Sequence, residues 1–377
     1  MVHLYASEDK DAALPTSSSP MIKAAASPFD ADMGVGGAGL GAHPGLRRTA
    51  SSKRGERHSD HADAAGPAFA HTKIHPPPAH AADVLRTRPV MTLTPAEIYE
   101  QCAHHGEVKS KMSWLQLIVL TTIAGCYVGF GFTICLMVGG NVGADLLAQR
   151  PGLFSLAFGV VGFPAAFTMI VINGAELFTS LCAYMTAAWW EGRVTIGACV
   201  RMWVVSWMGN FAGCAIFLGL IYSTDLYEGK DWYTLLLAQK KVHHSFGSAL
   251  VRGIFANWLV GIATWQANAA QDLAGKAIGI WLPISAFAML GFEHVIANQF
   301  VLPMAIALGA PISAYDVIVK NFIPATLGNW IGGAVCVATV YAFAYGTPNR
   351  RVTAFFDRRL SSWRAGRPSL SARVLPA

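Results

Sequence analysis

The chain has 377 residues, of which 53% are hydrophobic and only 13% are charged, whereas soluble domains average about 25% charged residues. Lys and Arg number 28 against 22 Asp and Glu, so the formal net charge is +6. Uncharged stretches separate these charges, and they are long enough for the ~20 apolar residues with which a helix crosses a bilayer. The pattern excludes an ordinary water-soluble enzyme and predicts a polytopic membrane protein.

The N-terminal segment differs from the rest in composition. It is rich in Ala, Ser, Pro, Gly and His and has few large apolar side chains, so it cannot bury enough surface to offset the entropy cost of ordering. We predict a disordered tail over residues 1–93. The segment has no apolar h-region, and Glu8, Asp9 and Asp11 argue against a transit peptide. The first span is therefore expected to act as the insertion signal.

Histidine and cysteine spacing predicts no metal site. The tail histidines do not have the spacing of a compact metal site, and the 7 cysteines are odd in number without a C-x-x-C pair. Most cysteines lie in apolar stretches, where they behave as small hydrophobes. We expect neither a metal nor a cofactor.

The ordered part opens with Thr94-Pro95-Ala96-Glu97. Thr94 and Glu97 form a capping box, and Pro95 suits the first helical position. A short helix is expected to follow over about 98–111. It is too polar to cross a bilayer and is expected to lie at the membrane surface.

Six apolar stretches follow, at about 114–139, 153–190, 202–222, 253–270, 277–308 and 323–345. The second and fifth are too long for one straight helix and are interrupted at 173–179 and 291–298. We predict an all-α membrane protein whose six transmembrane helices, with the second and fifth broken, form a transporter domain over residues 94–347.

The C-terminal segment, residues 348–377, holds the whole net charge. It contains seven Arg and one Asp, and 7 − 1 = 6. By the positive-inside rule this basic tail is cytoplasmic, and six crossings place the N-terminus on the same side. The tail would also be attracted to the headgroups of anionic membrane lipids. Beside a membrane span, nucleic-acid binding is not expected.

A repeated motif relates the two halves of the domain. Glu176, in Gly-Ala-Glu, precedes Asn210 by 210 − 176 = 34 residues, and Glu293, in Gly-Phe-Glu, precedes Asn329 by 329 − 293 = 36 residues. Short motifs can recur by chance, but the matching broken-helix context favours a true repeat. Two three-span units joined in series have opposite orientations, and inverted repeats with broken helices indicate a transport pathway at the midplane.

Three ionisable side chains lie inside the apolar stretches: Glu176, Glu293 and His294. We interpret both glutamates as structural, with carboxylates that accept hydrogen bonds from amides at the helix breaks or from Asn210, Asn329 or Asn257. For His294 we predict a function, because the equivalent residue of the first half is Leu177 and the repeat does not demand a histidine. An imidazole can donate a hydrogen bond to an anion and exchange a proton.

Neutral donors surround the predicted site. The N-terminal ends of broken helices present unpaired N–H groups, which favour anions without a buried cation. Thr179 and Asn257 can add further donors at the same place. The combination suits a small monovalent carboxylate or a similar anion.

Several motifs resemble those of the formate/nitrite transporter family. They are Asn-Gly-Ala-Glu-Leu-Phe-Thr at 173–179, Lys-Val-His-His-Ser-Phe at 241–246, Ala-Asn-Trp-Leu-Val at 256–260, Gly-Phe-Glu-His-Val-Ile-Ala-Asn at 291–298 and Gly-Asn-Trp-Ile-Gly-Gly at 328–333. The resemblance implies aquaporin-like six-span protomers that assemble as homopentamers, each protomer with its own pore for formate, nitrite, acetate, lactate or hydrosulfide.

The resemblance also implies residue roles. His294 becomes the central pore histidine, Thr179 and Asn257 its pore neighbours, and Lys241 the basic residue of the outer vestibule. Phe163 and Phe167 are expected at the cytoplasmic constriction, and Leu177 and Phe287 at the other apolar narrowings. The run Pro164-Ala165-Ala166 departs from the Ser-Leu-Gly associated with bacterial members, and the long N-terminal tail is similar to that of protist or other eukaryotic members.

The expected mechanism follows from desolvation. A bare carboxylate would lose most of its hydration among phenylalanines, and protonation removes most of that cost. Lys241 would concentrate the anion, which would cross as the neutral acid with a proton from bulk water or through His294. We expect no ATP use, because no Walker motif is present, and we expect the plasma membrane, with an internal membrane as the alternative.

Two other functions are compatible with parts of this pattern. An aquaporin-like pore for neutral solutes shares the architecture, but the chain has no Asn-Pro-Ala. An intramembrane enzyme would use Glu293 and His294 as acid and base, but adjacent helical residues diverge by ~100°. We therefore expect no enzymatic activity.

Overall fold

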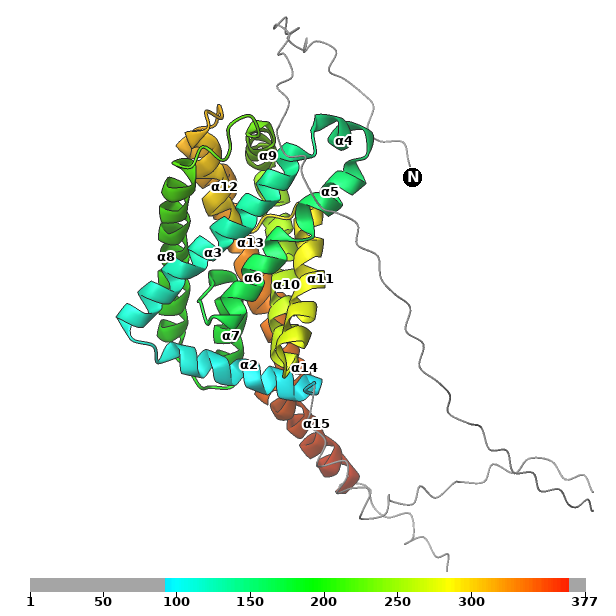
Figure 1. Ribbon diagram of the computed structural model, residues 1–377. Helices are drawn as coiled ribbons and strands as arrows, with labels where there is room; N and C mark the ends of the chain where they lie inside the picture. Colours follow the sequence, from blue (N-terminus) through cyan, green and yellow to red (C-terminus); the bar gives the residue numbers. More distant parts are fainter. Residues whose placement is uncertain (1–91, 366–377) are drawn as a thin grey trace, which may run out of the picture. The chain divides into compact units, whose positions relative to one another are not determined.

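The described part of the chain, residues 92–365 of a computed structural model, is helical almost throughout (Figure 1). Within this part, extended pairing is limited to an isolated bridge between Thr92 and Ala270. The prediction of an all-α fold is confirmed. The predicted disordered tail lies outside the described residues except at its last two positions.

Helix α2 (Pro95–Ser110) begins with the predicted capping box. The Thr94 hydroxyl accepts a hydrogen bond from the Glu97 amide at 3.4 Å, and the Glu97 carboxylate accepts one from the Thr94 amide at 2.8 Å. Figure 1 shows α2 lying across one end of the helix bundle. A separate cap, Ser113, starts α3 (Trp114–Asn141).

The remaining helices cross the bundle or lie at its ends. In the first half they are α4 (Ala144–Gln149), α5 (Pro151–Gly159), α6 (Gly162–Ile172), α7 (Phe178–Trp190) and α8 (Ile196–Tyr222). In the second half they are α9 (Trp232–His243), α10 (Phe246–Ala269), α11 (Leu273–Met289) and α12 (Val295–Ala307). The last span joins η1 (Asp316–Phe322), α13 (Ile323–Ile331), η2 (Gly332–Thr339) and α14 (Val340–Tyr345), and α15 (Thr347–Ala365) follows it.

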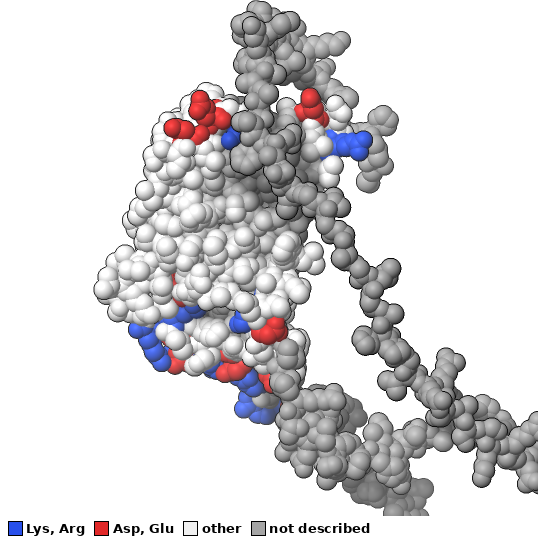
Figure 2. Space-filling model, viewed as in Figure 1, with Lys and Arg blue, Asp and Glu red and all other residues white. Residues whose placement is uncertain are grey.

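Five segments of the described chain are long and apolar enough to cross a membrane: Trp114–Asn141, Pro151–Ile172, Ile196–Tyr222, Phe246–Ala269 and Asp316–Tyr345. The predicted fifth span is divided into two shorter apolar helices, α11 and α12. In Figure 2 the visible charged side chains gather at two ends of the molecule, with an uncharged band between them. This distribution suits an integral membrane protein, because a charged side chain in hydrocarbon is costly.

Two ends of the bundle can be distinguished (Figure 1). One carries α2 and α15 and is called the α2 end here; the other carries α4 and α9 and is called the α9 end. The sequence prediction did not include α4 and α9. Both are short helices at the bundle end, where side chains meet polar surroundings and hydropathy gives no signal.

Both predicted helix breaks are present. The first lies between α6 and α7 and the second between α11 and α12. Gly174 has φ +72° and Gly291 has φ +65°, a left-handed conformation that glycine adopts without a steric penalty. Each glycine stands two residues before a glutamate of the repeat, Glu176 or Glu293.

Close helix packing follows the same repeat. On α8, a Cβ added at Gly213 would collide with the backbone of α3 at Thr122. On the last span, a Cβ added at Gly332 would collide with the backbone of α10 at Ile254. Small residues at such crossings let membrane helices approach closely.

Replacing Gly213 with alanine is expected to lower the free energy of unfolding by about 1–3 kcal/mol, because two backbones would have to separate. Gly219 lies on the same helix, and a Cβ there would meet nothing within 4 Å. Gly219→Ala is expected to be neutral or stabilising by up to ~1 kcal/mol through helix propensity. Thermal unfolding in detergent measures both, and equal midpoints for the two variants would contradict the packing argument.

Candidate functional site

Two buried asparagines hold the helix breaks together. Asn210 on α8 accepts a hydrogen bond from the Phe178 amide at 2.9 Å, and its side chain donates to the carbonyls of Glu176 at 2.9 Å and Thr121 at 2.8 Å. The amide of Phe178 is the first of α7, and the Glu176 carbonyl precedes that helix. Asn210 therefore replaces backbone partners that the break removes.

Asn329 repeats this arrangement in the second half. It accepts from the Val295 amide at 2.8 Å and donates to the carbonyls of Glu293 and Gly253, both at 2.8 Å. The same three kinds of bond occur around both asparagines. The structure thus gives the sequence repeat a physical reason: each half must satisfy one broken helix.

The glutamate carboxylates have partners that differ from those expected. Asn210 and Asn329 bind the backbone carbonyls of Glu176 and Glu293 and not their carboxylates. The Glu176 carboxylate forms an ion pair with Lys109 of α2. The Glu293 carboxylate forms one with Lys241 of α9, at 3.1 and 3.2 Å. The expected asparagine partners were wrong, because a buried carboxylate needs a counter-charge as well as hydrogen bonds.

The two lysines occupy equivalent positions in the two halves. Lys109 precedes Ser113, the N-cap of α3, by 113 − 109 = 4 residues. Lys241 precedes Ser245, the N-cap of α10, by 245 − 241 = 4 residues. The inverted repeat therefore extends to α2 and α9. Lys109 was not among the residues predicted from the sequence, although the shared Lys-x-x-x-Ser spacing could have identified it.

The second ion pair is the more enclosed. The Lys241 and Glu293 side chains are 8% and 1% exposed, against 19% for Lys109 and 3% for Glu176. Glu293 also accepts hydrogen bonds from Asn298 at 2.7 Å and Asn321 at 2.9 Å. Lys241 was expected as a basic residue of an outer vestibule; the structure places it at the α9 end in contact with this carboxylate.

His294 links the two broken helices. Its Nδ1 accepts a hydrogen bond from the Ala297 amide at 3.1 Å, so the side chain caps α12. Its Nε2 lies 3.1 Å from the Thr179 hydroxyl of α7. Because Nδ1 acts as an acceptor, the neutral ring carries its proton on Nε2 and donates to Thr179. The Thr179 hydroxyl proton is then free to bond a third group.

A small cavity of about 20 Å³ lies beside His294, and this volume admits about one water molecule. All four predicted constriction residues line it together with His294: Phe163, Phe167, Leu177 and Phe287. The Phe287 ring is 5.6 Å from the imidazole, centre to centre. The site is therefore a nearly dry apolar chamber with one imidazole in its wall.

Two of the residues that line the chamber also line a second cavity. The second cavity, of about 230 Å³ at the α2 end, is lined by Lys109, Glu176, Ile170 and Leu177, among others. Ile170 and Leu177 line both cavities and so lie between them. Phe163 is at the start of α6, where α5 leads in from the α9 end, and its ring is 5.2 Å from that of Phe287.

Phe163 and Phe167 were expected at the cytoplasmic constriction. Both line the central chamber and neither lines the cavity at the α2 end. The reason is the direction of α6, which runs from the α9 end toward the first break, so its last residues come nearest to α2.

Asn257 binds the backbone close to the chamber. Its side chain donates to the carbonyls of Thr179 at 3.1 Å and Asn329 at 2.6 Å, and it does not line the chamber. Asn257 was expected as a pore donor, and both hydrogens of its side-chain NH2 group are donated to these backbone carbonyls. Within residues 92–365, no group of three or more His, Cys, Asp and Glu is placed to hold a metal ion.

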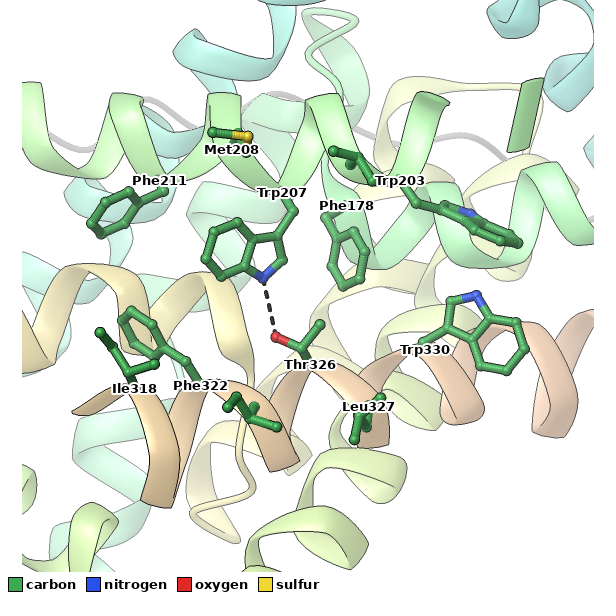
Figure 3. A pocket seen from close by; sticks show the side chains of 12 residues that line it. Phe178, Trp203, Trp207, Met208, Phe211, Ile318, Phe322, Thr326, Leu327 and Trp330 are labelled. Atoms are coloured by element: carbon green, nitrogen blue, oxygen red, sulfur yellow. Dashed lines mark hydrogen bonds between the residues drawn. The ribbon is translucent and has the colours of Figure 1, made fainter. Parts of the chain in front are cut away.

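A further cavity lies on another face of the helix bundle. It is an apolar groove of about 740 Å³ between α8 and the last span (Figure 3). Trp207 closes one side and donates to the Thr326 hydroxyl across the groove at 3.1 Å. The lining carries no charged residue. Its only link to the site is Phe178, the residue before Thr179, so we assign it no chemistry.

Comparisons with known proteins agree in one family. The model of the formate/nitrite transporter family matches residues 96–343. A probable formate transporter of Methanothermobacter thermautotrophicus is 35% identical over 67% of this chain and 97% of its own length. A formate-nitrite transporter of Plasmodium falciparum is 30% identical over 66% of this chain and 84% of its own. The solved structure of a pentameric formate channel with formate bound is 29% identical, with a TM-score of 0.54 over 61% of this chain and 97% of that one.

The hydrogen bonds that Asn210 and Asn329 make at the helix breaks can be tested by measuring the stability of variants. Asn329→Ala would leave the Val295 amide and the Glu293 carbonyl at the break without a partner, so we expect a loss of free energy of unfolding of about 3 kcal/mol. Asn141→Ala is the control, because Asn141 is exposed and makes one bond, to the Met137 carbonyl at 2.7 Å. Thermal unfolding in detergent should show a much larger loss of stability for Asn329→Ala than for Asn141→Ala. Similar losses for the two variants would argue against a structural role for Asn329 at the break.

Proposed function

Because this chain belongs to the formate/nitrite transporter family, we propose that each protomer conducts small monovalent anions of weak acids, with formate, nitrite, lactate and acetate as candidates. The observation that carries the proposal is the chamber beside His294. Its lining is apolar apart from His294, whose Nε2 lies 3.1 Å from the Thr179 hydroxyl. One lysine–glutamate pair lies toward each end of the bundle.

Desolvation determines the form of the substrate. An anion inside the chamber would exchange bulk water for phenylalanine and leucine side chains, which costs several kcal/mol even with partial compensation. A neutral acid avoids most of this cost. The anion's proton affinity rises as it leaves water, so we propose proton-coupled transport in which the anion gains a proton before it reaches the phenylalanines.

The two lysines give each entrance a cation for the anion. Lys109 faces the cavity at the α2 end, and Lys241 holds the equivalent position at the α9 end. Each pairs with a glutamate, so the entrances carry no net charge from these pairs. An arriving anion can bind the ammonium group without leaving a permanent excess of charge at depth.

His294 acts as a neutral donor in this proposal. Its Nδ1 caps α12, and a proton on that nitrogen would remove the cap and set two N–H groups against each other. We therefore assign the transported proton to water in the entrances rather than to His294. The Thr179 hydroxyl, which accepts from Nε2, offers its own proton to a substrate oxygen.

We further propose a homopentamer in the plasma membrane with the α2 end in the cytoplasm. The similarity to a pentameric formate channel supports the assembly. The exposed arginines of α15, namely Arg350, Arg351, Arg358 and Arg359, support the orientation by the positive-inside rule.

Two alternatives can be weighed against the geometry. A pore for neutral solutes would use the same uncharged donors, and stopped-flow swelling of liposomes distinguishes it from an anion pathway. An enzyme with Glu293 and His294 as acid and base is disfavoured, because the carboxylate pairs with Lys241 and the imidazole with Thr179. The two groups are therefore not placed to act on one substrate.

Uptake into proteoliposomes tests the proposal. With an imposed pH gradient, acid outside, radiolabelled formate or lactate is expected to accumulate. His294→Ala is expected to reduce the rate about tenfold or more, because the chamber would lose its donor and α12 its cap. Uptake that ignored the pH gradient would refute proton coupling, and anion currents under voltage clamp would indicate a channel mode instead.

The Thr179 hydroxyl can be tested separately. Thr179→Val preserves the shape and removes the donor, so we expect uptake to fall about tenfold while the fold persists. Thr186→Val is the control, since Thr186 lies on the same helix with a buried hydroxyl that has no hydrogen-bond partner. Equal uptake by the two variants would exclude a substrate contact for Thr179.

A further inference from the structure

A histidine stands beside the ion pair at the α9 end. His244 follows α9 and has its Nε2 3.9 Å from the Glu293 carboxylate. Its side chain is 27% exposed, against 1% for Glu293. His244 is thus the member of this cluster that meets bulk water, and it can exchange protons with that side of the membrane.

The repeat does not demand a histidine there. Position 244 follows Lys241 by 3 residues, and 3 residues after Lys109 the first half has Met112. Met112 lines the cavity at the α2 end. By the symmetry of the two halves, His244 belongs to the lining of the opposite entrance, where it replaces an apolar side chain with a titratable one.

The two oxygens of the Glu293 carboxylate have different numbers of hydrogen-bond partners. Oε2 accepts from Lys241, Asn298 and Asn321. Oε1 accepts from Lys241 at 3.2 Å and otherwise has only His244, at 3.9 Å. A proton on His244 would turn this near approach into a charged contact on the oxygen that has room for it.

The surrounding charges set when that proton binds. His244 faces Lys241 and His243 from α9, Arg252 from α10 and Glu293 from the break. On η1, Asp316 and Lys320 pair with each other at 2.7 Å. Burial and then Arg252 hold the pKa of His244 below its usual value, with Glu293 opposing. The imidazole is therefore neutral at neutral pH and gains its charge only when the adjoining solution is acidic.

We infer that His244 is a proton-responsive positioning residue, whose protonated form takes over part of the Glu293 carboxylate and leaves the Lys241 ammonium group free to bind a small monovalent anion. The inference rests on the proposed transport function. It makes the entrance at the α9 end bind its anion more tightly when that side is acidic, which is the condition under which an anion and a proton would enter together.

The test is formate equilibrium exchange in proteoliposomes with the same pH inside and outside, from about pH 7.5 to about pH 5. Formation of the neutral acid changes equally in all variants, so the ratio of KM values isolates His244. For His244→Gln over wild type we expect a ratio near one at the higher pH and about fivefold at the lower. The maximal rates should keep a constant ratio.

Two further variants sharpen the result. His243→Gln is the matched control, because His243 is the exposed neighbour, and its ratio should stay near one throughout. His244→Arg supplies a permanent cation and should show the low KM of the acidic wild type even at the higher pH. A pH-independent ratio for His244→Gln, the same rise in His243→Gln, or identical behaviour of His244→Arg and His244→Gln would each overturn the inference.

The same experiment distinguishes failure of the proposed function from failure of the role of His244. Absence of formate exchange in wild type would reject both proposals together. Exchange in wild type with a flat ratio would reject the role of His244 alone.

Discussion

The need to satisfy backbone groups where two helices break inside a membrane governs this structure. No water is available in hydrocarbon to bind a free amide or carbonyl, so a broken helix must find internal partners. Asn210 and Asn329 supply them, each with one accepted and two donated hydrogen bonds. The flanking glycines of α8 and α13 bring these asparagines close enough by admitting backbone contact. The most regular features of the two halves, Gly-x-Glu and Gly-Asn-x-x-Gly, are therefore parts of one structural solution.

The site exists because the breaks exist. They place the first residues of α7 and α12 at the same depth, so that Thr179 and His294 meet at 3.1 Å although 115 residues separate them. Each break also turns a glutamate toward an entrance, where a lysine from a helix at the bundle end neutralises it. The result is a dry chamber between two charged but neutralised entrances. This geometry favours a solute that sheds its charge between the entrances and the chamber.

Three residues to which we assign a role in transport lie where the two halves differ. His294 corresponds to Leu177, Thr179 to Ile296 by its distance of 3 residues from the repeat glutamate, and His244 to Met112. The shared residues, by contrast, hold the backbone or pair its charges. A symmetric scaffold explains the asparagines, glycines and glutamates without reference to transport, so the positions where the two halves differ are the more informative about function.

Much of this could be predicted from the sequence, because spans, breaks and the capping box at Thr94 depend on local composition and on residues a few positions apart. His294 could also be selected, since a histidine in an apolar stretch is costly wherever the chain folds. The pairing of Lys109 with Glu176, the binding of Asn257 to backbone carbonyls, and the order of Phe163 and Leu177 along the chamber could not. Those depend on which way each helix runs and on partners 67 to 115 residues away. Hydropathy and spacing thus determined which segments enter the membrane, and only the tertiary structure decided which buried polar groups meet there, because a side chain's partner is fixed by packing in space and not by distance along the chain.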